Sequence, residues 1–113
     1  MSGAPPLHSL EELYGELWVS LASLLRSYTA VHGLSRNRTA MVELSEEKIL
    51  VRHGGKWLEL ARQGAAVAWK REDGSQGTLE LTQAGTLRGQ AGEDEMDMAA
   101  EAWAGQIMRE SHQ

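Results

Sequence analysis

Residues 39–88 limit the fold of this 113-residue chain more than any other stretch. Apolar and polar side chains alternate there in short segments, and two or three residues separate each segment from the next, as at Gly54-Gly55. Alternation with a period of two predicts strands with one buried face, and connections this short join antiparallel neighbours. The stretch therefore predicts a meander of five or six antiparallel strands.

The lengths of the turns predict the register of these strands. A two-residue turn at Gly54-Gly55 places Val51 opposite Leu58. Further turns are predicted at residues 46–47, 63–64, 73–75 and 83–85. In this register Trp69 lies opposite Leu58 and Leu79. Every turn keeps the large apolar side chains on one face of the sheet, whereas a slip of one residue would turn the apolar side chains of a strand toward water. The predicted core face comprises Val42, Leu44, Ile49, Val51, Leu58, Leu60, Val67, Trp69, Leu79, Leu81 and Leu87.

A long amphipathic helix is predicted before the strands. It starts at a capping box formed by Ser9 and Glu12 and ends at Gly33. Its apolar stripe has helical spacing and consists of Leu10, Leu13, Tyr14, Leu17, Leu21, Leu24, Leu25 and Tyr28.

A second helix is predicted after the strands. It opens at residues 92–95, where the acidic side chains suit the positive end of a helix dipole. Its apolar stripe consists of Met96, Ala99, Ala100, Trp103, Ile107 and Met108. Because both helices need an apolar partner and the sheet offers one such face, the sequence predicts an α+β two-layer sandwich with both helices on one face of the meander. Residues 9–110 then form a single domain, with a flexible lead at 1–8 and a frayed end at 111–113.

Composition narrows the classes of function and location. A net charge of −5 disfavours a nucleic-acid binder, because phosphate contacts need clustered lysines and arginines, and we predict that the short basic cluster at residues 36–38 is a loop. The chain has no cysteine, which excludes thiol catalysis and Cys-ligated metals. The first residues lack the pattern of a signal peptide, and no stretch reaches the ~20 apolar residues of a membrane span. We expect a cytoplasmic protein that does not contact membranes.

The residue types that carry chemistry lack the spacing of a catalytic or metal motif. Histidines stand far apart at positions 8, 32, 53 and 112, the serines of the first helix have no nucleophile elbow, and the glycines mark turns rather than a phosphate loop. We therefore expect a non-enzymatic protein without a cofactor. A ligand-binding or enzymatic role would need a pocket between helices and sheet, lined by His53 or Tyr14.

The face of the sheet opposite the core carries the candidate site. This face is mostly polar, but Ala61, Ala66 and Ala68 lie at its centre with Leu50 and Trp57 beside them. Arg52 and Lys70 are predicted to flank Trp57. An aromatic side chain among small residues and an arginine is typical of interface hot spots. The alternative interpretation of this composition is ordinary cross-strand packing, in which the side chains of Arg52 and Lys70 lie over the Trp57 indole. We predict a surface that binds a protein partner or a second copy of the chain, formed by Trp57, Leu50, Arg52, Lys70, Ala66 and Ala68.

The order of the predicted elements also resembles that of the frataxin family. Residues 17–21 (Leu-Trp-Val-Ser-Leu) look similar to the family's first helix, and residues 48–63 resemble its paired second and third strands around a glycine turn. The family's Gln and exposed Trp have no match, since Trp69 faces the predicted core, and the family's acidic ridge is matched by few carboxylates. The resemblance implies an alternative function, an iron-binding adaptor of iron–sulfur cluster assembly that would use Glu11, Glu12, Glu16 and Glu43.

Overall fold

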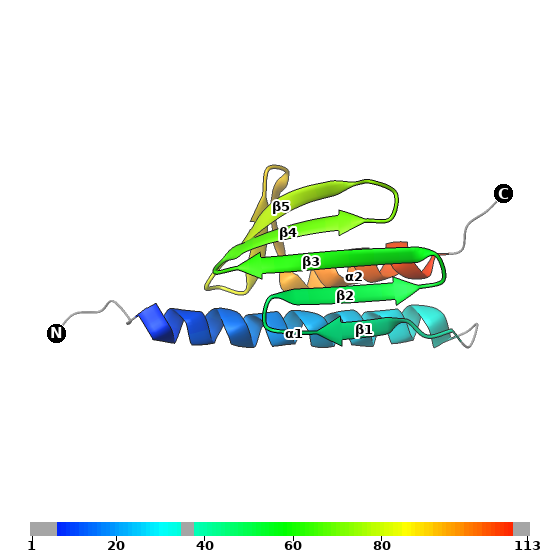
Figure 1. Ribbon diagram of the computed structural model, residues 1–113, viewed down its shortest axis with the longest axis horizontal. Coiled ribbons are helices and arrows are strands. Elements are labelled where there is room, and N and C mark those ends of the chain that lie inside the picture. The colour runs from blue at the N-terminus through cyan, green and yellow to red at the C-terminus, as the bar shows by residue number, and fades with distance from the viewer. Residues whose placement is uncertain (1–6, 35–37, 110–113) are drawn as a thin grey trace.

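The computed structural model describes residues 7–34 and 38–109 and confirms the α+β class (Figure 1). One antiparallel sheet has the strand order β1-β2-β3-β4-β5-β6-β7, so each strand is joined to its neighbour by a short turn or loop. The sheet has seven strands, one more than the five or six that the sequence predicts. Both helices lie behind β1–β3 in the view of Figure 1. The elements are α1 (Leu7–Gly33), β1 (Met41–Leu44), β2 (Lys48–His53), β3 (Lys56–Gln63), β4 (Ala66–Arg71), β5 (Gln76–Leu81), β6 (Thr86–Gly89), β7 (Gly92–Glu95) and α2 (Met96–Met108).

Three of the predicted strand registers are confirmed. Val51 pairs with Val42 on one side and with Leu58 on the other, so β1, β2 and β3 align as the two-residue turns require. Leu81 pairs with Leu87, as the three-residue turn at 83–85 predicts.

The registers on either side of β4 differ from the prediction by two residues. The β3–β4 turn consists of residues 64–65 rather than 63–64, and the β4–β5 loop of residues 72–74 rather than 73–75. In each connection a glycine takes the position that needs a positive φ, +61° at Gly64 and +91° at Gly74. Trp69 therefore lies opposite Leu60 and Gly77. A shift of two residues preserves the side on which a residue lies, so the predicted core face is unchanged.

The helical start predicted at residues 92–95 is wrong, because these residues form β7. A two-residue turn between Gly89 and Gly92 sends the chain back along β6, where it hydrogen-bonds to the outer edge of that strand. Every residue of β7 is exposed, and its three acidic side chains suit an edge strand because charge there discourages pairing with another sheet. Helix α2 follows directly, with Glu95 at its N-cap position.

The first helix begins two residues before the predicted capping box, at Leu7. The helix ends at Gly33 as predicted, where a Cβ atom would lie 2.2 Å from the Arg38 carbonyl oxygen, so close approach of backbone requires glycine. Residues 1–6 of the predicted flexible lead, residues 36 and 37 of the basic cluster and the predicted frayed end at 111–113 lie outside the described residues.

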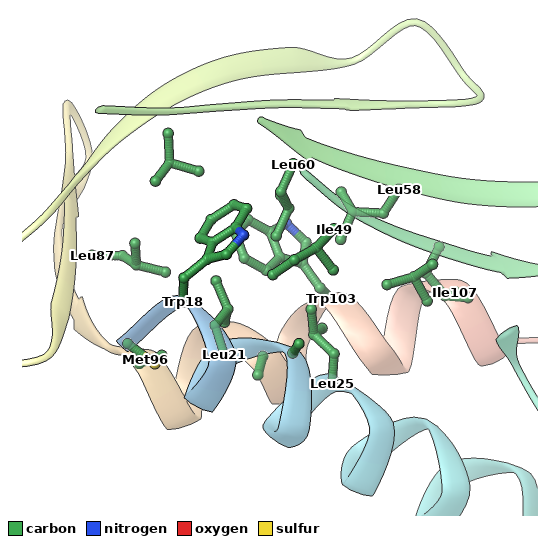
Figure 2. Packing of buried hydrophobic residues seen from close by; sticks show 14 of the residues in the cluster. Trp18, Leu21, Leu25, Ile49, Leu58, Leu60, Leu87, Met96, Trp103 and Ile107 are labelled. Carbon is green, nitrogen blue, oxygen red and sulfur yellow. The ribbon is translucent and has the colours of Figure 1, made fainter. Parts of the chain in front are cut away.

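The core lies between the two helices and the sheet (Figure 2). All of the predicted core-face residues belong to it, most of them fully buried and four of them half-buried. Trp18, which the predicted stripe omits, is only 1% exposed, and its indole N–H donates to the Ser45 carbonyl oxygen over 3.1 Å. Its position four residues after Tyr14 and three before Leu21 is the helical spacing that would have identified it.

Two arginines of the sheet, which the predicted core face omits, also point to the core side. Arg62 pairs across the sheet with Val67, and Arg71 with Leu58. The guanidinium of Arg62 lies 5.8 Å from the centre of the Trp18 ring, and its terminal nitrogens donate to backbone carbonyls at Gly64 and Glu46. This cation–π contact between Arg62 and Trp18 thus lies in the core layer.

Candidate functional site

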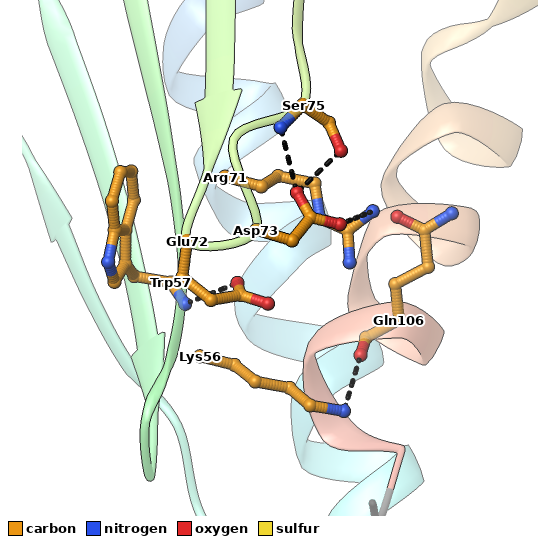
Figure 3. A network of polar contacts seen from close by, with 7 residues as sticks. All are labelled: Lys56, Trp57, Arg71, Glu72, Asp73, Ser75 and Gln106. Atoms are coloured by element: carbon orange, nitrogen blue, oxygen red, sulfur yellow. Dashed lines mark hydrogen bonds and ion pairs between the residues drawn. The ribbon is translucent and has the colours of Figure 1, made fainter.

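The open face is the side of β1–β5 that faces away from both helices (Figure 1). Trp57 points to this side, whereas its neighbour Lys56 reaches toward α2 (Figure 3). The Trp57 backbone N–H donates to the Glu72 carboxylate over 3.1 Å, and the Glu72 N–H donates to the Trp57 carbonyl over 3.3 Å. These two bonds hold the start of β3 against the β4–β5 loop, and with it the half-buried indole.

Small side chains leave a hollow at the centre of the open face. Ala61 and Ala68 pair directly across β3 and β4, and Thr78 follows on β5. The hollow has a volume of about 640 Å³, and the side chains of Lys48, Glu59 and Lys70 border it. A second hollow, which also contains Ala66, continues from it toward the β3–β4 turn. The open face is therefore recessed at the alanines and raised around them.

The charges on the open face are arranged in pairs. Glu59 lies between Lys48 and Lys70, with carboxylate-to-ammonium distances of 3.3 and 3.5 Å. Arg52 lies 3.8 Å from Glu43 on β1. Partial burial acts on the pKa of Glu59 most strongly and would raise it, but the hydrogen bonds and positive charge of Lys48 and Lys70 together bring this pKa below the ordinary value of about 4.5.

The structure brings together most, but not all, of the predicted contact residues. Arg52 lies directly across from Trp57, and Leu50 lies across from Glu59 beside the alanines. The prediction that Lys70 flanks Trp57 is wrong, because the shift of two residues between β3 and β4 places Lys70 opposite Glu59. Within residues 7–34 and 38–109, no cation lies over the Trp57 ring.

The carboxylates of the frataxin-like alternative do not converge in the structure. Glu43 is on the open face beside Arg52, whereas Glu11 is on α1, 4.0 Å from Arg62. Glu12 lies beside Glu11 in the notch between α1 and the β1–β2 turn, and Glu16 is exposed on α1. The described part of the chain contains no group of three or more His, Asp or Glu side chains able to hold a metal. The iron-binding alternative stays a prediction from the resemblance.

The ligand-binding alternative called for a pocket between helices and sheet lined by His53 or Tyr14. His53 borders a hollow at the β1–β2 edge, beside Thr39 and Met41, and not one between helices and sheet. His53 Nδ1 lies 3.2 Å from the Thr39 carbonyl oxygen, whereas Tyr14 packs against the core cluster from α1. A groove of about 630 Å³ lies on the helix side instead, and neither residue lines it. It lies between α2, the core side of β4–β5 and the β6–β7 hairpin. The sequence signals for it are Gly77 opposite Trp69 and the pair Ala99 and Ala102 on α2.

Comparison with known proteins gives no relative: no family model, curated protein or solved structure matches the chain. Among the residues described, neither helix has the length and apolar character needed to cross a membrane.

Proposed function

We propose that this protein is a non-enzymatic association module whose open face binds a second copy of the chain. The observation that carries the proposal is the balance of charge on that face. Strands β1–β5 present three acidic and three basic side chains there: Glu43, Glu59, Glu80, Lys48, Arg52 and Lys70.

The whole chain, by contrast, has a net charge of −5. The excess negative charge therefore lies on the rest of the surface, and two copies that meet through the neutral open face bring no net charge together. Each of the six side chains already has an oppositely charged partner within one chain, Glu80 through Arg88 of β6, so the face can be covered without leaving an isolated charge buried.

The relief of the open face fits a symmetric contact. Trp57 stands four residues from Ala61 along β3, which is about 13 Å at the rise of a strand. A two-fold axis midway between them, near Glu59, places each Trp57 over the alanine hollow of the other copy, and such reciprocal contacts define an isologous dimer. An aromatic side chain in a recess is the arrangement that contributes most to protein interfaces.

The size of the face sets the expected strength of association. Five strands about 4.8 Å apart, each roughly 20 Å long, cover about 500 Å² per copy. This lies below the ~800 Å² per partner of a standard interface, so we expect a dimer with a dissociation constant in the micromolar range or weaker.

Sedimentation equilibrium between about 10 µM and about 1 mM tests the proposal. Wild-type protein should shift from monomer to dimer over this range. Ala68→Arg, which fills the hollow that receives the Trp57 of the other copy, should weaken the dimer by at least about tenfold. Trp57→Ala should weaken it by a similar factor.

Ser23→Arg serves as the matched control, because it adds the same side chain at an exposed position of α1. This variant should associate as the wild type does, with circular dichroism showing that all variants are folded. A wild-type protein that remains monomeric at about 1 mM refutes the proposal, as does a dimer that Ala68→Arg leaves unchanged.

A further inference from the structure

The groove on the helix side, described above, has a mixed lining in which apolar and aromatic side chains form two of the walls. Trp69, Leu79 and Leu87 line it from the sheet, and Trp103 lines it from α2. The indole of Trp69 lies against Gly77, where a Cβ atom would be 2.8 Å from the indole nitrogen, so the glycine allows the ring to lie flat on the sheet. The volume, about 630 Å³, is within the range of sites for small molecules.

Small residues keep this groove open. Positions 99, 102, 103 and 106 of α2 have the spacing of one helix face, and this face borders the groove beside the buried stripe of the helix. Two of these positions are alanines, so the helix surface there is recessed, and the other two are Trp103 and Gln106. Among the described residues, the indole N–H groups of Trp69 and Trp103 donate no hydrogen bond.

The charge of the groove has one sign. Its lining includes the acidic residues Glu93 and Asp94 and no lysine, arginine or histidine. Glu93 accepts a hydrogen bond from the Thr86 hydroxyl, whereas Asp94 faces the core side of β7 opposite Leu87 and has no hydrogen-bond or ion-pair partner among the described residues. The field from these groups and from a net charge of −5 attracts cations and repels anions.

We infer that this groove binds a small organic ammonium ion with an apolar or aromatic body. Indole rings are the strongest side-chain partners for such cations through the cation–π interaction, and the apolar walls bury the body of the ligand while Asp94 pairs with its charge. This site lies on the opposite side of the sheet from the association surface, and Trp69, Gly77 and Thr78 border the hollows on both sides.

Nuclear magnetic resonance titration of the intact chain tests the inference, with the indole N–H signals of the four tryptophans as reporters. The probe is benzyltrimethylammonium, and its controls at equal ionic strength are benzyl alcohol and benzenesulfonate, which present the same ring with no charge or with a negative charge. The cation should shift the signals of Trp69 and Trp103 and bind at least about fivefold more tightly than either control.

Three variants place the cation in the groove. Asp94→Asn should weaken its binding about threefold, whereas Glu95→Gln, on the next residue of β7 and outside the groove, should leave it unchanged. Ala102→Leu fills the groove from an exposed position and should reduce binding at least about tenfold without unfolding the chain. The inference is overturned if the alcohol or the sulfonate binds as tightly as the cation, if the Trp69 and Trp103 signals do not move, or if Ala102→Leu binds the cation as the wild type does.

Discussion

Replacement of Trp18 by phenylalanine tests how the first helix is held to the sheet. The change removes roughly 50 Å² of buried apolar surface, which corresponds to about 1.2 kcal/mol at about 25 cal/mol per Å². It also removes the hydrogen bond to the Ser45 carbonyl oxygen, which contributes about 1 kcal/mol. Trp18→Phe should therefore lower the free energy of unfolding by about 2 kcal/mol, and Trp18→Ala by about 4 kcal/mol because a cavity is left.

Urea unfolding followed by far-ultraviolet circular dichroism measures this loss without depending on tryptophan fluorescence. At typical slopes for a domain of this size, 2 kcal/mol moves the midpoint by roughly 1–2 M urea. Val19→Ala is the matched control, because Val19 is the next residue and is 50% exposed, and it should change stability by less than about 0.5 kcal/mol. All samples need one protein concentration, since dimerisation would add to stability. If Trp18→Phe costs no more than Val19→Ala, the proposed packing of α1 on the sheet is wrong.

Three further predictions follow from individual contacts. Gly33→Ala should destabilise the chain by about 2 kcal/mol in urea unfolding, because a Cβ atom there meets the Arg38 carbonyl. Gly15→Ala should instead stabilise α1 by about 0.5–1 kcal/mol, because the space around Gly15 is open. Equal effects of the two substitutions would contradict this geometry. The pKa of Glu59 is lower in the folded chain than its ordinary value of about 4.5, so the contribution of Glu59 to stability is present above that pH and is lost as the pH falls through the folded-state pKa. The difference in urea midpoint between wild type and Glu59→Gln should therefore shrink on acidification. A difference that stays constant down to about pH 3 would count against the lysine contacts. The hydrogen bond from the Tyr28 hydroxyl to Asp97 raises the pKa of Tyr28 above 10, so absorbance titration of Asp97→Asn should show this phenol ionising at lower pH than in the wild type, and identical titrations would refute the contact.

Much of the fold follows from local patterns in the sequence. The Gly54-Gly55 turn and the alternation around it are sufficient to place Val51 against Leu58, because a slip of one residue would expose both strands. The registers around β4 were harder to predict, because each turn there contains one glycine and the sequence does not reveal at which position of the turn the positive φ falls, as Gly64 and Gly74 show. An error of two residues leaves the faces intact, and for this reason the core face could be predicted correctly from partly wrong turns.

The sites were less predictable than the fold. The open face was identified from alternation, but its charge pattern depends on the register, so the Lys48–Glu59–Lys70 group could not be seen while Lys70 was placed beside Trp57. The strand β7 was missed because its acidic residues favour a helix start as well as an exposed edge, and the choice depends on the turn that leads back along β6. The groove arises from how the β6–β7 hairpin, β4–β5 and α2 come together in space, which no local pattern contains.

The most direct test of the central claim is a map of the surface on which two chains meet. Backbone amide signals in nuclear magnetic resonance spectra should be compared between about 50 µM and about 1 mM protein. If the open face is the association surface, the concentration-dependent shifts should concentrate at Ala61, Ala66, Ala68 and Thr78 and at the Trp57 indole, and α1 should remain unchanged. Shifts confined to α1, α2 or the edge strands, or no shifts at all, would contradict the claim.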